Sequence, residues 1–65
     1  MIEITLNGAK HKATARTLAA LLIETEMGPK VATAHNGQFV PAHAREATLL
    51  SQGDVVEVLS AMQGG

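Results

Sequence analysis

Apolar and polar side chains alternate at the start of the chain, over residues 2–6. A period of two places successive side chains on opposite faces of a β-strand, so this pattern predicts a half-buried strand. Asn7-Gly8 follows it directly. Because a type I′ turn needs positive φ at both central residues, Asn-Gly is a strong hairpin signal. We therefore expect a return strand over residues 9–15.

The period of the apolar positions changes after Thr17. Leucines recur at i, i+3 and i+4 from Leu18 to Leu22, which is the spacing of one helix face. Thr17 is a good N-cap, since its hydroxyl accepts a hydrogen bond from an N–H of the first turn. Gly28-Pro29 is a good stop signal. Together these residues predict a helix over residues 18–27.

A second strand pair is predicted in the middle of the chain. Residues 31–35 have the composition of a strand, and Asn36-Gly37 repeats the turn signal of the first hairpin. A short strand at residues 39–40 is closed by Pro41, which has no N–H to donate to a neighbouring strand. His35, beside the turn, is interpreted as a strand-face or turn residue rather than a ligand.

The last predicted strand covers residues 55–59, where valines alternate with a glutamate. It follows a turn at Gly53-Asp54, and residues 42–51 are expected to form a loop with a helical turn. Leu22 and Val56 are predicted core positions. A long hairpin, one helix and further strands predict an α+β fold of two layers.

Length, composition and charge narrow the choice of function. At roughly 100 to 200 residues per domain, a chain of 65 residues forms one domain. It has no cysteine, so thiolate metal sites, redox motifs and cysteine nucleophiles are excluded. No apolar stretch approaches the ~20 residues of a membrane span, and no signal peptide is visible. We therefore expect a cytoplasmic protein with no membrane partner.

The formal net charge is -1, and Phe39 is the single aromatic residue. A small β-rich domain that binds single strands is expected to have a basic groove and several stacking aromatics. The sequence has neither feature, so nucleic acid is not expected as a partner.

No residue pattern predicts catalysis, a metal site or a bound cofactor. The histidines lack metal-ligand or helical spacing; they are His11, His35 and His43. Glu24 and Glu26 are too close in sequence to share a helix face, and they are interpreted as part of a solvated surface.

The chain ends in Gly64-Gly65. A terminal carboxylate becomes a reactive group once it is activated with ATP. Glycines have no side chain and accept many backbone conformations, so such a tail can enter a narrow cleft of a partner. The sequence has no glycine-rich phosphate loop, so a partner must bind the ATP. The C-terminus is therefore the predicted reactive group.

Four features together resemble the ThiS family of sulfur carrier proteins. They are the opening hairpin over residues 2–8, Asn36-Gly37 followed by Val40-Pro41, the turn and strand over residues 53–58, and the terminal Gly64-Gly65. They cover nearly the whole chain in the family's order. The resemblance implies the β-grasp fold of ubiquitin-like proteins. This fold has a mixed sheet of four to five strands, one helix packed across it and a flexible C-terminal Gly-Gly tail, here residues 61–65.

The resemblance also implies a function. It implies that a ThiF-like adenylyltransferase uses ATP to adenylylate Gly65, which is then converted to a thiocarboxylate with sulfur from a sulfur-donating enzyme. The sulfur goes to a ThiG-like thiazole synthase for the thiazole ring of thiamine. The chain itself is a protein co-substrate and not an enzyme. Two alternatives stay open: a MoaD-like sulfur carrier for molybdopterin, and a ubiquitin-like interaction module or protein modifier.

Contact with these partners requires exposed apolar surface. Leu59, opposite in phase to the valines of its strand, and Met62, just before the tail, are candidates, with Phe39 as a third. In the alternative interpretation, Leu59 and Met62 fill the edge of the core. Gln63 and Gly64 are predicted to thread into the partner.

Three positions depart from the pattern of the family. ThiS proteins commonly have an arginine directly after the Val-Pro pair and a tryptophan a few residues on, whereas this chain has Ala42 there and Arg45 nearby. His35 stands where an apolar residue is usual. The departures concern partner contacts around residues 41–46 more than the terminal chemistry.

Overall fold

The structure is a computed structural model that describes residues 1–60. Its elements in chain order are β1 (Ile2–Leu6), β2 (Ala9–Ala13), α1 (Leu18–Glu24), β3 (Val31–His35), β4 (Gln38–Val40), the 3-10 helix η1 (Ala42–Ala47) and β5 (Val55–Ser60). The five strands form one sheet in the order β2-β1-β5-β3-β4. β1 and β5 run parallel, and the other neighbours are antiparallel. The predicted α+β fold with a mixed sheet and one helix across it is therefore confirmed.

Both hairpins turn at an Asn-Gly pair. Asn7 and Asn36 each have φ of 51°, and Gly8 and Gly37 each have φ of 85°. Positive φ at both central residues is what a type I′ turn requires, and this turn matches the twist of the flanking strands. The turn chemistry therefore decides where each hairpin reverses.

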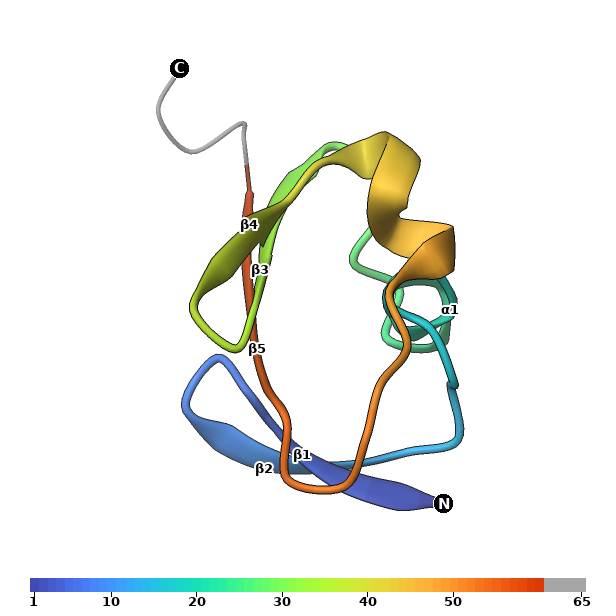
Figure 1. The fold of residues 1–65 in the computed structure, drawn as a ribbon, viewed down its shortest axis with the longest axis vertical. Helices are drawn as coiled ribbons and strands as arrows, with labels where there is room; N and C mark the ends of the chain where they lie inside the picture. The colour runs from blue at the N-terminus through green and yellow to red at the C-terminus, as the bar shows by residue number, and fades with distance from the viewer. Residues whose placement is uncertain (61–65) are drawn as a thin grey trace.

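The core lies between the sheet and the two helices, which occupy the same side of the sheet (Figure 1). Leu18, Leu21 and Leu22 form the buried face of α1, as the i, i+3, i+4 spacing predicted. They pack with inward-facing strand residues, of which Ile4 and Val56 are among the most deeply buried. Leu22 and Val56 are thus confirmed as core residues.

Helix α1 ends three residues earlier than predicted, at Glu24 rather than residue 27. Glu26 has φ of 58°, so the backbone leaves the right-handed helix there. Glu26 N–H donates to Ile23 O, and Met27 N–H donates to Leu22 O. These two bonds form a Schellman motif, which satisfies the last helical carbonyls and stops the helix before Gly28.

The N-terminal end of α1 is as predicted, because the Thr17 hydroxyl accepts from Ala20 N–H over 3.1 Å. Strand β2 was predicted to residue 15 but ends at Ala13. The N–H groups of Thr14 and Ala15 donate to the Glu24 carboxylate instead of to a strand. A side chain of the helix thus ends the strand.

The remaining differences between prediction and structure are small. β4 begins at Gln38, one residue before its predicted start, and β5 extends to Ser60, one residue beyond its predicted end. Within residues 42–51, the predicted helical turn is the 3-10 helix η1.

Candidate functional site

The sheet has an outer face that neither helix covers. Along β5 the burial alternates, with Val56 and Val58 buried and Leu59 69% exposed. Phe39 on β4 is 70% exposed. Strand pairing sets Phe39 opposite Ala34 and Leu59 opposite Ala32, so these four residues line one face, which we call the outer sheet face. Leu59 therefore does not fill the edge of the core.

The other predicted site residues lie outside the described part of the chain; they are Met62, Gln63, Gly64 and Gly65. They follow β5, which ends at Ser60 and lies in the middle of the sheet, between β1 and β3. β5, the strand that leads to the predicted reactive group, is therefore paired on both sides. The hydrogen bonds that hold β5 in place are part of the site.

The turn residue Asn7 holds one side of β5. Its Oδ1 accepts from Val58 N–H over 2.7 Å, and its Nδ2 donates to Val58 O over 3.1 Å. The strand register between β1 and β5 pairs Thr5 with Val55 and Leu6 with Val56. The amide of Asn7 therefore extends this short parallel pairing by one reciprocal pair of bonds.

Asn36 makes the equivalent connection on the other side of β5. Its N–H donates to Val55 O over 2.7 Å, and its Oδ1 accepts from Val55 N–H over 2.8 Å. Its Nδ2 donates to Asp54 over 3.2 Å. The sequence explains both asparagines only through their φ angles, because the hydrogen-bond partner of each side chain is distant in sequence.

His35 pairs with Asp54 at the start of β5. The His35 Nε2 lies 2.6 Å from Asp54 Oδ2, and both side chains are partly buried. Ser51 N–H also donates to Asp54 Oδ2 over 2.9 Å. Partial burial opposes ionisation of Asp54, but hydrogen bonds from His35, Ser51 and Asn36 outweigh it and lower the carboxyl pKa. This departure from the family pattern thus connects β3 to the turn before β5.

Glu24 is exposed, in agreement with the solvated surface that the sequence indicated, and its carboxylate also accepts several hydrogen bonds. Its Oε1 accepts from Thr14 Oγ1 over 2.6 Å, from Thr14 N–H and from Ala15 N–H, and its Oε2 lies 3.1 Å from His11 Nε2. The Thr14 hydroxyl, followed by His11 and the backbone N–H groups, lowers the carboxyl pKa to about 2. Glu24 thereby holds the end of the first hairpin against α1.

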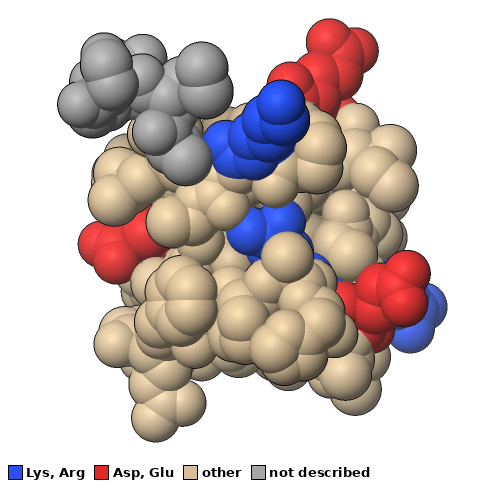
Figure 2. All heavy atoms as spheres, turned by 90° about the horizontal axis from the view of Figure 1, so that it is seen from above, with Lys and Arg blue, Asp and Glu red and all other residues tan. Residues whose placement is uncertain are grey.

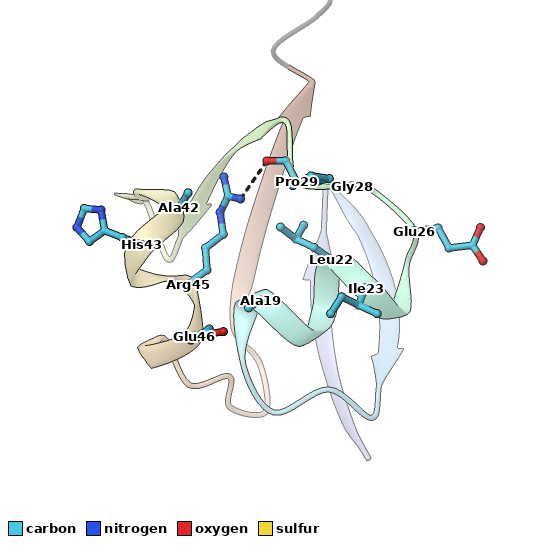
Figure 3. Close-up of a pocket in the computed structure, with 10 residues that line it drawn as sticks. All are labelled: Ala19, Leu22, Ile23, Glu26, Gly28, Pro29, Ala42, His43, Arg45 and Glu46. Atoms are coloured by element: carbon cyan, nitrogen blue, oxygen red, sulfur yellow. Dashed lines mark hydrogen bonds between the residues drawn. The ribbon is translucent and has the colours of Figure 1, made fainter.

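Arg45 is buried, which the sequence did not predict for a loop residue. Its guanidinium donates to Thr33 Oγ1, Pro29 O and Val31 O. Figure 3 shows the bond to Pro29 and the side chain extending from η1 toward the segment before β3. The side chain thus joins η1 to β3, and it lines a hollow of about 570 Å³ between the two helices.

These clusters do not combine into a catalytic centre. Within residues 1–60, no group of three or more potential metal ligands comes together. In that same range, no helix is long and apolar enough to cross a membrane. On the face seen in Figure 2, basic side chains lie beside acidic and uncharged ones and form no continuous basic stripe.

The sheet order, the helix across it and the exposed outer face define a β-grasp protein of the ubiquitin-like kind. A model of the ThiS family matches residues 4–65, and the chain belongs to this family of carrier proteins.

Among solved structures, the chain is similar to the crystal structure of a thiamine biosynthesis protein (ThiS) from Geobacter metallireducens. The two share 29% sequence identity with a TM-score of 0.81, over 98% of this chain and 100% of the other. A search of curated proteins returns no match.

Proposed function

We propose that the chain is a sulfur carrier of thiamine biosynthesis whose working group is the Gly65 carboxylate. The observation that carries the proposal is the ThiS family match, which extends through Gly64-Gly65 to residue 65. The similarity to a thiamine biosynthesis protein over 98% of the chain supports the pathway. The outer sheet face, with Phe39 and Leu59 exposed, supports a role that depends on docking.

The chemistry begins with activation of a poor electrophile. A carboxylate oxygen of Gly65 attacks the α-phosphorus of ATP, pyrophosphate leaves, and an acyl adenylate forms. A ThiF-like adenylyltransferase supplies the ATP site, because the sequence has no glycine-rich phosphate loop. Sulfide-level sulfur released by a sulfur-donating enzyme then attacks the carbonyl carbon and AMP leaves, which yields a thiocarboxylate. A ThiG-like thiazole synthase receives that sulfur for the thiazole ring.

The chain contributes position rather than catalysis. Phe39 and Leu59 dock the outer sheet face on a partner, and Met62 adds apolar contact beside the tail. Gln63 and Gly64 thread into the partner's cleft, where the absence of a side chain at Gly64 gives the activated carbon a close approach. Asn7 and Asn36 hold β5, so the docked face and the tail that follows it share a rigid base.

Intact-mass analysis tests the proposal. The chain is incubated with a ThiF-like adenylyltransferase, ATP and a sulfur source, and its mass should rise by one exchange of oxygen for sulfur at Gly65. A chain that lacks Gly65 is the control and should stay unmodified. Modification at an internal residue, or an isopeptide bond from Gly65 to a lysine, would overturn the proposal. Sulfur transfer to a molybdopterin precursor in place of a thiazole would overturn the pathway.

A further inference from the structure

The hollow between α1 and η1 has no part in the proposed sulfur transfer. Residues of both helices and of the Gly28-Pro29 connection line it (Figure 3). Its lining is largely apolar, with Ala19 and Leu22 from α1, and Ile23, which is 79% exposed, also lines it. Because α1 packs on the inner face of the sheet, this hollow lies on the opposite side of the molecule from the outer sheet face.

Arg45 brings to the hollow a positive charge that pairs with no carboxylate of residues 1–60. The residue is only 7% exposed, and its three hydrogen-bond acceptors are two backbone carbonyls and a hydroxyl, all neutral. Within residues 1–60 the ion pairs are His11–Glu24 and His35–Asp54, so no described carboxylate pairs with Arg45. Removal of a charge from water is costly, and buried charges are therefore normally paired.

The guanidinium also retains hydrogen-bonding capacity. A guanidinium has five N–H donors, and Arg45 uses three of them for hydrogen bonds within residues 1–60. An incoming carboxylate can accept charge-assisted hydrogen bonds from the remaining N–H groups, and these bonds are roughly twice as strong as neutral ones. The hollow therefore combines a cationic group with apolar walls.

We propose that the hollow between α1 and η1 docks a segment of a partner protein that carries an Asp or Glu side chain flanked by apolar residues. The carboxylate binds the Arg45 guanidinium, and the apolar neighbours cover Leu22 and Ile23. Charge complementarity with Arg45 selects the carboxylate. The continuation of apolar surface to the exposed Ile23 favours a chain segment over a small anion.

Two acidic residues, Glu26 and Glu46, also line the hollow and favour the opposite charge. Both are exposed, so water and salt screen them more strongly than the buried Arg45. In Figure 3 the Glu26 carboxylate points away from Arg45. The buried Arg45 guanidinium therefore has a larger electrostatic effect on a docked carboxylate than the two glutamates have. A peptide with a basic residue in place of the acidic one tests this conclusion directly.

Amide chemical-shift titration of the full chain measures the docking. The probes are acetyl-Leu-Glu-Leu-amide and the matched peptides with Gln or Lys in the central position. We expect the Glu peptide to bind about tenfold more tightly than either control, as loss of a charge-assisted hydrogen bond implies. Its shifts should map to residues 19–29 and 42–46. Equal binding of the Gln peptide, or tighter binding of the Lys peptide, would overturn the proposal.

Substitutions at two similarly exposed apolar residues give a matched comparison. Ile23→Ser should weaken binding of the Glu peptide several-fold, whereas Leu59→Ser, on the outer sheet face, should leave it unchanged. Arg45→Gln should abolish the preference for Glu over Gln, provided that circular dichroism shows a folded chain. If Arg45→Gln does not fold, the comparison of the three peptides and the Ile23→Ser variant test the proposal instead.

Three further outcomes contradict the proposal. These are shifts centred on Phe39 and Leu59, binding of acetate as tight as that of the Glu peptide, and no shift at millimolar peptide. The proposed function invokes the outer sheet face and the C-terminal tail and not this hollow, so failure here leaves the proposed function intact.

Discussion

Asn7 and Val58 lie 51 residues apart in the sequence and exchange a reciprocal pair of hydrogen bonds of 2.7 and 3.1 Å. A side-chain amide thereby replaces a strand residue in the pairing of β1 with β5. Since β5 leads to the predicted reactive end of the chain, this contact joins the first turn of the protein to its functional strand.

The first prediction tests this contact with Asn7→Gly. Glycine accepts positive φ, so the turn is kept while both bonds to Val58 are lost. We expect the free energy of unfolding to fall by about 1–3 kcal/mol, because Val58 loses its partners in a partly buried site. Urea unfolding gives the value. Asn7→Asp keeps the accepting oxygen, so its free energy of unfolding should lie between those of the wild type and Asn7→Gly. Wild-type stability of Asn7→Gly would contradict the prediction.

The second prediction concerns the end of α1. Glu26 has φ of 58°, a left-handed conformation that is unfavourable for residues with a Cβ. Glu26→Gly should therefore stabilise the chain by about 0.5–1 kcal/mol, measured by urea unfolding. Glu26→Ala is the control, because it removes the carboxylate but keeps the strained φ. An equal gain from both variants would assign the effect to charge instead.

The third prediction is a loss of stability in acid. The pKa of Glu24 is lowered from 4.5 to about 2, and that of Asp54 is also lowered, so both carboxylates favour the folded state when ionised. This contribution is complete above the unfolded pKa and disappears as pH falls through the folded one. Unfolding midpoints should therefore drop between about pH 5 and pH 2. Glu24→Gln should flatten this dependence, and an unchanged profile would contradict the assignment.

The fourth prediction separates fold from activity. Leu22→Ala and Val56→Ala remove buried groups and should cost about 2–4 and 1–3 kcal/mol respectively. We expect deletion of Gly65 to abolish adenylylation with almost no change in thermal unfolding. Calorimetry and an adenylylation assay on the same samples compare the two effects. If the deletion unfolds the chain, the division between core and tail is wrong.

The fifth prediction distinguishes threading from docking. Gly64→Val leaves the Gly65 carboxylate in place but adds a branched Cβ one residue from the activated carbon. Binding to a ThiF-like adenylyltransferase should stay near normal, while ATP–pyrophosphate exchange is largely lost. Leu59→Ser is the complementary variant and should weaken binding itself. If Gly64→Val supports ATP–pyrophosphate exchange at the wild-type rate, the tail does not enter a narrow cleft of the partner.

Several features of this protein were predictable because their causes are local. The period of two over residues 2–6 and the leucine spacing after Thr17 each specify a face to bury, and tertiary packing then buries those faces. Asn36-Gly37 specifies its turn through the φ angles of two adjacent residues. The order of these local signals was enough to indicate the ThiS family and its β-grasp fold.

Only the tertiary structure decided the features that depend on distant partners. The Glu24 carboxylate ends β2 by taking N–H groups that a longer strand would pair. Arg45, in a segment expected to be a loop with a helical turn, is buried because the carbonyls of Pro29, before β3, and of Val31, its first residue, accept hydrogen bonds from its guanidinium. Side-chain hydrogen bonds of this kind leave no periodic pattern in the sequence, since each depends on one distance that exists only after the chain has folded.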